Sequence, residues 1–457
     1  MPKPWRKPNN EDRFFVHCFF PDHFYGTETY TLELAKNYRN WGHDVVIVSA
    51  LFQGEPAAAE LITRYEHEGF EVVLVDKNKI PHVNIKETYY QAEMRPVLTD
   101  ILADLKPDIV HVTHLINHTS ALLEATKALG IPTYATFTDF FGFCLTNKLE
   151  AADGALCAGP SRTRSNCVAC YLKETARTSK EGWIKYANNG TSAKLIASAV
   201  TALRKMPGVK NSVFDQTIDY IAERPDILGA LYSGSYAGAV APTTFLREAY
   251  VNNDIKVPMK TLWFGIDVDR TPKPQRDAEH IPVIGFIGQI APHKGTDLLI
   301  DAFNRLPKGS ARLLIYGPTD QDPAYMEELK AKSAGTQIEF RGVFESKDMV
   351  NILRDMDTLV IPSRWYENSP LVLLNALATH TPALVSDVRG MTEFVEAGVN
   401  GEIFDRGSAE DLYRKLSAWV ANPQALYDLA KTTNYERTPE IMARETFAMY
   451  SKATESA

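Results

Sequence analysis

Short runs of apolar residues alternate along this chain with longer stretches in which apolar residues return every three or four positions. Within the first 50 residues, an apolar run at 13–20 precedes a loop, a periodic stretch at 27–41 and the run Val45-Val46-Ile47-Val48. Short apolar runs predict buried strands, and a period near 3.6 predicts amphipathic helices. The segment is therefore predicted to form a βαβ unit. Further strands are expected at 71–75, 109–112 and 133–136, with helices at 89–105 and 119–129.

The same alternation starts again near residue 282. Strands are expected at 283–287, 311–316, 338–340, 358–361 and 383–385, and helices at 296–304, 326–334, 347–354 and 370–380. Strands that alternate with helices are typical of parallel sheets covered by helices. The fold class is thus α/β, with two Rossmann-like, doubly wound domains. We expect them to face each other across a cleft at the carboxyl ends of both sheets, where such sheets bind ligands.

The segment 270–282 contains three prolines and little apolar surface, so it is the predicted linker between these domains. An N-terminal domain is expected at 1–270 and a C-terminal domain at 271–440. The last segment, 441–457, is expected to form a helix or tail that packs back on the N-terminal domain. A loop-like insert at about 142–172 interrupts the N-terminal pattern.

The composition is that of an ordinary globular protein: 457 residues, of which 45% are hydrophobic and 23% charged. With 49 Lys+Arg against 57 Asp+Glu the formal charge is -8, which argues against a dedicated nucleic-acid binder. No stretch approaches the roughly 18 to 20 consecutive apolar residues that span a bilayer, and the N-terminus lacks the apolar core of a secretory signal. We therefore expect a cytoplasmic protein without a nucleic-acid partner.

Several common nucleotide and hydrolase motifs are missing. The first strand is not followed by GxGxxG, and the chain contains neither GxxxxGK[ST] nor GxSxG with an oxyanion loop. These motifs are the usual cradles for a nicotinamide cofactor, for a nucleotide in a P-loop and for a hydrolase nucleophile. Ordinary dehydrogenases, P-loop ATPases and α/β-hydrolases are thereby disfavoured.

Loop residues at the ends of two predicted strands suit an anion. Lys294 precedes a helix after the strand 283–287, which places an ammonium group beside a helix N-terminus. In WYENSPLVLLNALA, Ser369 is expected to cap the next helix and Pro370 to occupy its first turn, leaving the N–H groups of Leu371 and Val372 for an anion. Glu367 would stand close to that anion, an arrangement that favours a ligand with hydroxyl groups. For Lys294, a solvated loop lysine remains an equal alternative.

The C-terminal half resembles the nucleotide-sugar domain of family 4 glycosyltransferases of the GT-B fold. The segments that carry the resemblance are FIGQIAPHKG, LLIYG, FRGVF and DMDTLVIPSRWYENSPLVLLNALATHTPALVSDVRGMTEFVEAGVNGEIF. In the N-terminal half they are the loop at Gly26-Thr27-Glu28, GHDVVIVS, KPDIVHVTHLI, APTTFLREAY and WFGID. Bacterial O-antigen, capsule and exopolysaccharide assembly enzymes are similar in this way.

The resemblance implies roles for individual residues. Lys294 would contact the donor diphosphate, and Glu367 would open the family's E-x7-E element beside the transferred sugar. Gly26 would let the first loop approach the donor, and Gly342-Val343 would lie along the nucleoside. The complete predicted donor site is Gly26, Gly288, Gln289, Lys294, Gly317, Gly342, Val343, Glu367, Ser369, Leu371, Val372 and Asn375.

The chain departs from the family pattern at four places. Asn375 replaces the second glutamate of E-x7-E, so the charge-assisted bond to a ribose hydroxyl is lost. Gln289 replaces the arginine of the diphosphate clamp. Gly26-Thr27 stands for the usual Gly-Gly pair, and Thr138-Asp139 for the usual His-Asp pair.

Candidate catalytic residues are Glu367, Lys294, Asp139 and His114. His114 follows the strand 109–112 and would reach acceptor or donor sugar, with a hydrogen-bonded strand-end histidine as the equal alternative. Asp139 follows the next strand and is the better acceptor-side candidate, because an acceptor hydroxyl must lose its proton; otherwise it caps the next turn. The D-x-D triplets at 267–269 and 355–357 lie at a linker and a strand entry, so a catalytic metal is not expected.

Four of the five cysteines lie close together in the insert, as Cys144, Cys157, Cys167 and Cys170. In a reducing compartment such a group binds metal more often than it forms disulfides. Four thiolates suit a structural zinc ion that pins a loop without its own core. Free thiols and disulfides remain alternatives. Cys18 is expected to be a buried small hydrophobe in the first strand.

The resemblance implies a retaining glycosyltransferase without a catalytic metal. It would move a sugar from a UDP- or GDP-linked donor to a glycan or lipid-linked acceptor, with peripheral contact at the inner face of the membrane. Two alternatives stay open: another GT-B enzyme, such as a sugar-nucleotide epimerase or phosphorylase, or a non-catalytic binding subunit of a glycan-assembly complex. The insert 171–235, including 183–186 and 193–203, could serve as an acceptor platform or a membrane-surface element, although a packed helix is the favoured interpretation.

Overall fold

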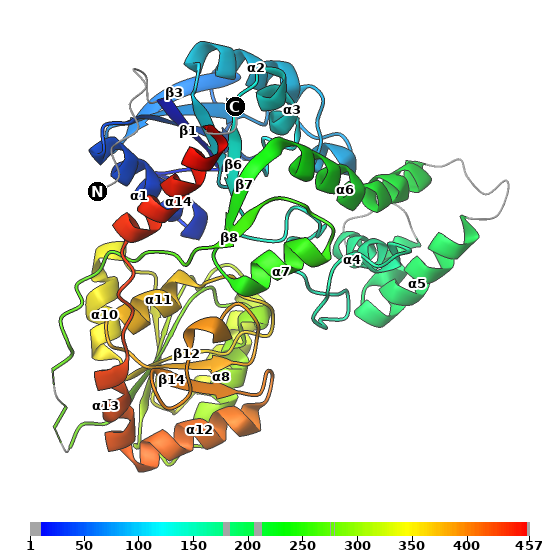
Figure 1. Ribbon diagram of the computed structural model, residues 1–457. Helices are drawn as coiled ribbons and strands as arrows, with labels where there is room; N and C mark the ends of the chain where they lie inside the picture. The colour runs from blue at the N-terminus through cyan, green and yellow to red at the C-terminus, as the bar shows by residue number, and fades with distance from the viewer. Residues whose placement is uncertain (1–10, 177–182, 205–212, 275, 278, 455–457) are drawn as a thin grey trace. The chain divides into compact units, whose positions relative to one another are not determined.

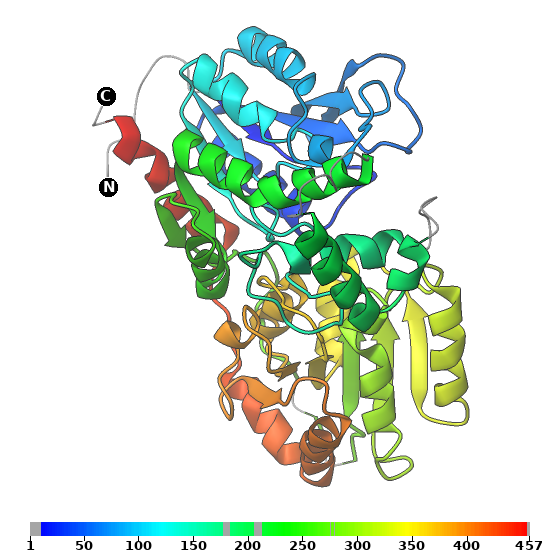
Figure 2. The ribbon, with the colours of Figure 1, turned by 90° about the vertical axis from the view of Figure 1, so that its right-hand side faces the viewer.

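The computed structural model describes residues 11–176, 183–204, 213–274, 276–277 and 279–454 (Figure 1). The chain divides into two compact units. Unit 1 comprises Met1–Trp263 and Pro439–Ala457, and unit 2 comprises Phe264–Thr438. Each unit has a twisted sheet with helices on both faces (Figures 1 and 2). The predicted tail residues 455–457 lie outside the described part of the chain.

Unit 1 is built on a sheet with the strand order β3-β4-β2-β1-β5-β6-β7-β8. Its strands pair in parallel except for β3, which runs antiparallel to β4. The sequence order reverses direction between the neighbours β1 and β5, so the loops after these two strands diverge there. The strands are β1 (Glu11–Phe15), β2 (Asp44–Leu51), β3 (Ile62–His67), β4 (Phe70–Asp76), β5 (Ile109–Val112), β6 (Thr133–Thr136), β7 (Tyr236–Ala241) and β8 (Met259–Thr261).

The helices of unit 1 include a group, α4 to α6, that lies to one side of the sheet in Figure 1. This group has its own small apolar core, to which α4, α5, α6, the 3-10 helix η2 and Ala152 contribute. The helices of the unit are α1 (Gly26–Asn40), α2 (Met94–Leu105), α3 (Ala121–Ala128), α4 (Ser165–Thr175), α5 (Gly190–Leu203), α6 (Val213–Ser235), α7 (Thr244–Asn252) and α14 (Pro439–Thr454), with short 3-10 helices η1 (Ile85–Thr88) and η2 (Ile184–Ala187).

The C-terminal helix α14 packs on unit 1 beside α1 (Figure 1). Its Tyr450 is buried, and its hydroxyl lies 2.7 Å from Nδ1 of His111 and accepts from Tyr38 at 3.2 Å. The Tyr450 carbonyl accepts from Tyr134 at 3.2 Å. Because these partners lie on α1, β5 and β6, the last helix ties together parts of the chain that are more than 300 residues away in sequence.

Unit 2 has the strand order β11-β10-β9-β12-β13-β14, with parallel pairing throughout its described ladders. The order reverses between β9 and β12, as in a Rossmann sheet. Its elements are β9 (Val283–Ile287), η3 (Pro292–Lys294), α8 (Thr296–Phe303), β10 (Arg312–Tyr316), α9 (Pro323–Ser333), β11 (Ile338–Gly342), η4 (Ser346–Asp348), α10 (Met349–Asp355), β12 (Thr358–Ile361), α11 (Leu371–Ala378), β13 (Ala383–Ser386), η5 (Thr392–Phe394), β14 (Gly401–Phe404), α12 (Ala409–Ala421) and α13 (Pro423–Thr432).

Local expectations fail in three places. The first strand ends at Phe15 rather than at 20, because the chain turns into a loop there, and the helix expected from 89 begins at Met94 after a 3-10 turn. The antiparallel edge strand β3 was not expected, since Ile62–His67 alternates exposure and lacks a long apolar run.

The described residues of the segment 270–282 pack against the rest of unit 2 instead of forming a free linker. Lys273 Nζ donates to the carbonyl of Leu353 at 2.8 Å, and burial lowers the pKa of this lysine to about 7. Arg276 and His280 both bind Asp357, at 2.9 and 2.7 Å. The proline-rich segment is therefore bound to the surface of unit 2 by hydrogen bonds and ion pairs.

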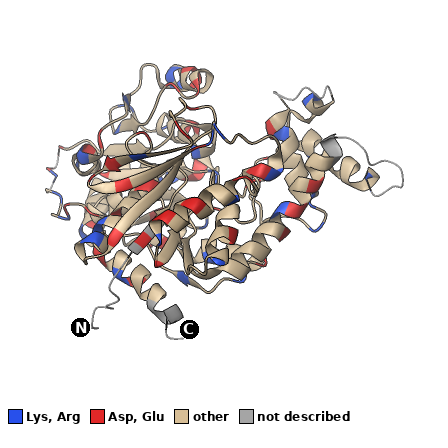
Figure 3. Cartoon of the chain, turned by 90° about the horizontal axis from the view of Figure 1, so that it is seen from above, with Lys and Arg blue, Asp and Glu red and all other residues tan. Residues whose placement is uncertain are grey.

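None of the described helices is long and apolar enough to cross a bilayer. Basic and acidic residues are interspersed along the helices in the view of Figure 3.

The buried histidines of unit 1 predict a pH dependence of stability. Burial lowers the pKa of His111 to about 3 and that of His118 to about 4, from 6.5. The unfolded chain therefore binds more protons below pH 6.5, and stability falls as the pH drops from 6.5 towards 4. Each of these two histidines should lower the free energy of unfolding by roughly 1.4 kcal/mol for each pH unit in that range. Urea unfolding between pH 7 and pH 5 measures this slope.

The variant His111→Gln removes one titrating group, so its unfolding free energy should fall less steeply with decreasing pH than that of the parent. His23→Gln is the control, because the His23 side chain is 21% exposed beside Glu55. Equal slopes for His111→Gln and the parent would contradict the account.

Candidate functional site

The first group of predicted residues gathers where β9 and β12 end, at the reversal point of the unit 2 sheet. The loop after β9 leads through Gly288 and Gln289 to Lys294, and the loop after β12 leads through Ser363 to Glu367. Since β9 and β12 are parallel neighbours, both loops leave from the same edge of the sheet. This edge is where open α/β sheets bind ligands.

Glu367 is the centre of this group. Its Oε1 accepts from Lys294 Nζ and Ser363 Oγ, both at 2.7 Å, and from Trp365 Nε1 at 3.1 Å. The residue is buried, whereas the Lys294 side chain keeps 22% of its surface exposed. Lys294 Nζ also lies 5.1 Å from the centre of the Trp365 ring. One oxygen of the Glu367 carboxylate thus accepts three hydrogen bonds. The Lys294 ammonium group is held by this carboxylate but remains accessible to solvent.

A close backbone approach joins the two loops. Gly295 has φ +73, and a Cβ atom there would stand 2.0 Å from the carbonyl oxygen of Pro362. Arg364 N donates to the carbonyl of His293 at 2.8 Å, and the Arg364 guanidinium binds both Asp297 oxygens at 2.8 Å. Burial opposes ionisation of Asp297, yet the bonds from Arg364 and Tyr325 lower its pKa. The close approach at Gly295 and the bonds of Arg364 thus determine the position of the loop that carries Lys294.

The start of α11 differs from the expectation. Pro370, not Ser369, is the N-cap residue, and no side chain caps the helix. Ser369 has φ +56, a left-handed conformation that is rare outside glycine. Its Oγ is buried without a hydrogen-bond partner in the described part of the chain. The helix therefore opens with the N–H groups of Leu371 and Val372, which have no acceptor within the helix.

The other predicted donor residues of unit 2 lie around the same sheet edge with different surroundings. Asn375 points its Nδ2 to the carbonyl of Leu371 at 2.8 Å, so the amide is held by its own helix. Gln289 is exposed, and Val343 is 74% exposed after Gly342. Gly317 is required by packing, because a Cβ there would lie 2.0 Å from the Gly288 carbonyl oxygen.

A second group gathers beyond the carboxyl ends of β5 and β6, next to the reversal point of the unit 1 sheet. His114 Nε2 lies 2.9 Å from Asp139 Oδ2, and His114 Nδ1 accepts from Ile116 N at 3.1 Å. The proton of the neutral ring is therefore on Nε2 and is donated to Asp139. The other carboxylate oxygen of Asp139 accepts from Phe141 N at 2.8 Å, as in the turn-capping alternative, and the side chain stays 27% exposed. His114 positions Asp139, and Asp139 faces solvent.

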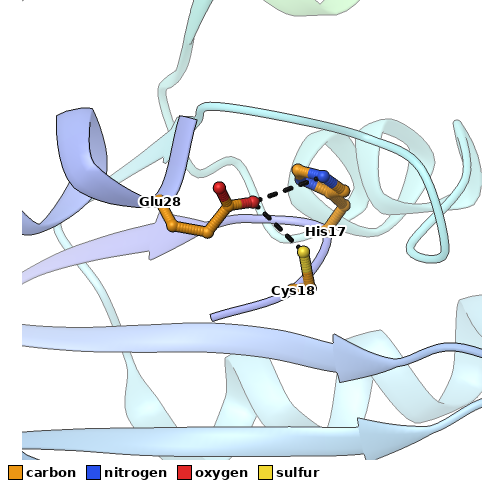
Figure 4. A group of neighbouring side chains, drawn as sticks. All are labelled: His17, Cys18 and Glu28. Atoms are coloured by element: carbon orange, nitrogen blue, oxygen red, sulfur yellow. Dashed lines mark hydrogen bonds and ion pairs between the residues drawn. The ribbon is translucent and has the colours of Figure 1, made fainter. Parts of the chain in front are cut away.

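His17, Cys18 and Glu28 form a cluster beside this pair that the sequence did not reveal (Figure 4). Glu28 Oε1 lies 3.1 Å from Cys18 Sγ and 3.3 Å from His17 Nε2. Cys18 is buried, as expected, but it lies beyond β1 and donates to a carboxylate. Burial, followed by the charge of Glu28, raises the pKa of Cys18. Burial and the neighbouring His114 lower the pKa of His17.

The predicted loop residue Gly26 is the first residue of α1. Its neighbour Thr27 bonds Thr138 at 3.3 Å, so two of the positions that depart from the family pattern touch each other. A hydroxyl pair here replaces the groups usual in the family.

Both D-x-D triplets are engaged in ion pairs within unit 2. Asp269 binds Arg354 at 2.8 Å, and Asp357 binds Arg276 and His280. These contacts give the aspartates a role in packing.

Family models match both halves of the chain. The model described as "Glycosyl transferases group 1" matches residues 267–436, and the one described as "Glycosyltransferase Family 4" matches residues 24–149. The chain belongs to the family 4 glycosyltransferases. This membership confirms the family predicted from the sequence. The two matched segments contain Lys294 and Glu367 in one case and His114 and Asp139 in the other.

Curated relatives of the glycosyltransferase match over part of the chain. The D-inositol 3-phosphate glycosyltransferase of Rhodococcus opacus is 30% identical over 157 residues, 32% of this chain and 35% of that protein. The mannosylfructose-phosphate synthase of Agrobacterium fabrum is 31% identical over 140 residues, covering 28% and 31%. In these matches the chain spans about a third of the relatives' length.

Solved structures match over nearly the whole length. Sucrose-phosphate synthase from Thermosynechococcus elongatus has a TM-score of 0.64 at 13% identity, covering 98% of this chain and 100% of that one. The Anabaena protein HepE in complex with UDP has a TM-score of 0.59 at 14% identity, covering 98% and 99%. This likeness confirms the predicted GT-B fold.

Gly295→Ala tests the close approach that positions Lys294. We expect it to lower the free energy of unfolding by several kcal/mol, because the added methyl group meets the Pro362 carbonyl. Gly309→Ala is the matched control: its φ is +80, but nothing lies within 4 Å of the added atom. It should cost only about 1 kcal/mol, the cost of the left-handed backbone. Equal losses in urea unfolding would contradict the proposed constraint.

Proposed function

We propose that this protein transfers a sugar from a nucleoside-diphosphate sugar to a hydroxyl group of a glycan or lipid-linked acceptor. The supporting observation is the contact between Lys294 and Glu367 next to the uncapped start of α11. It combines an ammonium group, free helix N–H groups and a carboxylate at one sheet edge. The structural neighbour HepE has been solved in complex with UDP and with UDP-glucose, which agrees with such a donor.

The leaving diphosphate would be stabilised by Lys294 and the N–H groups of Leu371 and Val372. As the bond from the anomeric carbon to the phosphate oxygen breaks, negative charge grows on the diphosphate, and fixed positive dipoles lower the barrier. The buried Oγ of Ser369, which has no partner within the described residues, offers a further donor to a phosphate oxygen. The left-handed backbone of Ser369 fits a strained position beside a ligand.

Glu367 would bind the transferred sugar. A lone carboxylate beside a diphosphate is repulsive, but three hydrogen bonds to its Oε1 already offset part of its charge. Hydroxyl groups of a sugar can donate to a carboxylate in the same way. Val343 and Gly342 would border the nucleoside. The resemblance to the family supports retention of configuration and transfer without a catalytic metal.

On unit 1, Asp139 would accept the proton of the acceptor hydroxyl, positioned by the neutral ring of His114. The new bond joins the acceptor oxygen to the anomeric carbon, and the nucleoside diphosphate departs. Exposed apolar side chains on η2 and α5 favour a lipid-linked acceptor at a membrane surface: Tyr186 is 64% exposed and Leu195 69%. Faster transfer to lipid-linked than to water-soluble acceptors would support that class.

UDP affinity tests the donor site. Lys294→Ala should weaken UDP binding about tenfold to a hundredfold, since a hydrogen bond to a charged group contributes roughly 1.5 to 3 kcal/mol. Glu367→Gln should not weaken it, because UDP lacks the sugar and the substitution removes a negative charge, although sugar transfer should fall steeply. Lys308→Ala, which alters an exposed lysine of unit 2, is the matched control. Isothermal titration and a UDP-release assay with added acceptor measure these effects.

Asp139→Asn distinguishes the acceptor-side role of unit 1 from donor binding by unit 2 in the same assays. It should leave UDP affinity unchanged and lower the rate of transfer. Unchanged UDP affinity in Lys294→Ala would contradict the donor site. UDP release that never depends on an added acceptor would favour an epimerase or a phosphorylase. No turnover of any nucleotide sugar would favour a binding subunit.

A further inference from the structure

The four cysteines of the insert line one small cavity in unit 1. Cys144, Cys157, Cys167 and Cys170 surround a space of about 20 Å³, together with Leu145, Thr146, Leu149, Glu150, Gly159, Pro160 and Asn166. They come from three places: Cys144 follows Phe143, Cys157 directly follows the loop 150–156 that a β-bridge closes, and Cys167 and Cys170 lie in the first turns of α4. The cavity has room for a single particle of the size of an ion or a water molecule. All four are free thiols.

The surroundings of Cys157 resemble those of a thiolate ligand. Its Sγ accepts from Gly159 N at 3.4 Å and from the side-chain amide of Asn166 at 3.6 Å. Asn166 is itself fixed, since its Oδ1 accepts from Ser161 N at 2.9 Å. N–H donors directed at sulfur stabilise a negatively charged ligand and orient it. Cys167 and Cys170, three residues apart on α4, lie on the same face of the helix.

A buried cation near the cysteines calls for a negative partner. Arg224 on α6 is only 2% exposed, and its Nη1 has no hydrogen-bond partner among the described residues. Its Nη2 donates to the carbonyl of Phe141 at 2.6 Å, three residues before Cys144. Burial lowers the pKa of Arg224, while the nearby Cys144 opposes the shift. A zinc ion with four thiolates carries a net charge of about −2 and would compensate this guanidinium.

The helical group around the cysteines has a weak core. Besides Cys167, its buried residues are mostly small: Ala152, Val168, Ala169, Leu172, Ala176, Ile184, Ala187, Ala193, Ala197, Ile218 and Ile221. Alanines bury little apolar surface, so such a group gains little stability from burial alone. A metal ion is a common way to stabilise a small group of this kind.

We propose that Cys144, Cys157, Cys167 and Cys170 bind one structural zinc ion as four thiolates. Tetrahedral sites with four sulfur ligands are typical of zinc, with Zn–S distances near 2.3 Å. When zinc binds, bonds to the metal replace two weak contacts of the thiols. Cys170 Sγ lies 3.6 Å from the Glu150 carbonyl oxygen, and Cys144 Sγ lies 3.6 Å from Thr146 Oγ1. Four thiol protons are released as the thiolates form.

The ion would anchor the chain that leads from the predicted acceptor site. Cys144 N donates to the carbonyl of Phe140 at 2.8 Å, and Phe141 N donates to Asp139. The metal would thus hold one end of the turn that carries Asp139. The site itself does not depend on the proposed transfer reaction.

Metal analysis of the full chain, purified without added metal and without an affinity tag that binds metal, tests the proposal. We expect about one zinc per chain by plasma mass spectrometry. Titration of the thiols with a mercurial reagent should release that zinc into a colorimetric indicator as four sulfurs react. Replacement by Co²⁺ should give the intense visible absorption of a tetrahedral thiolate site. This measurement needs no variant, so it stands even if a substitution prevents folding.

Cys167→Ser should lose most of the bound zinc and lower the melting temperature by several degrees. Cys18→Ser is the matched control, because Cys18 is buried elsewhere in unit 1 and bonds Glu28. A rival metal site is the cluster of His17, Cys18 and Glu28, whose ligand atoms lie within 4.8 Å of one another. If Cys18→Ser loses the zinc and Cys167→Ser keeps it, the metal belongs to that cluster and the proposal is overturned. Metal-free protein with four reactive thiols, a disulfide, or iron in place of zinc would overturn it as well.

Discussion

The parallel pairing of β9 with β12 is the constraint on which the candidate donor site depends. Because these neighbouring strands are parallel, their two loops leave the same edge of the sheet, and residues 73 positions apart in sequence meet. Gly295 lets the loops approach until the backbone of one contacts the carbonyl of Pro362 on the other. Lys294, Glu367 and the start of α11 are then placed by the backbone, so little conformational entropy is lost when a ligand binds.

The same constraint appears in unit 1 with different chemistry. Near the reversal between β1 and β5, two histidines lie beside carboxylates: His17 contacts Glu28, and His114 after β5 contacts Asp139 after the neighbouring strand β6. Unit 2 instead offers an ammonium group and helix N–H groups. A cationic site suits a charged leaving group, and a carboxylate held by a neutral histidine suits a hydroxyl acceptor. Two sheets of similar topology thus carry complementary halves of the proposed reaction.

The sequence predicted the alternation of strands and helices, and with it the edge at which the site forms, because apolar periodicity is a local property. It also placed Lys294 and Glu367 at strand ends. It did not predict that Ser363 and Trp365 would share Oε1 of Glu367, or that Glu28 would bind His17, because such contacts depend on side-chain directions across loops. Ser369 failed as a cap because its backbone takes a left-handed conformation, which residue type alone does not reveal. The strand β3 was missed because an edge strand needs no apolar run.

A crystal structure of the protein with bound UDP tests the central claim most directly. We expect diphosphate oxygens within about 3.2 Å of Lys294 Nζ and of the backbone nitrogens of Leu371 and Val372, beyond the ends of β9 and β12. A diphosphate bound elsewhere on the chain, or a Lys294 that stays away from the phosphate while UDP is bound, would contradict it.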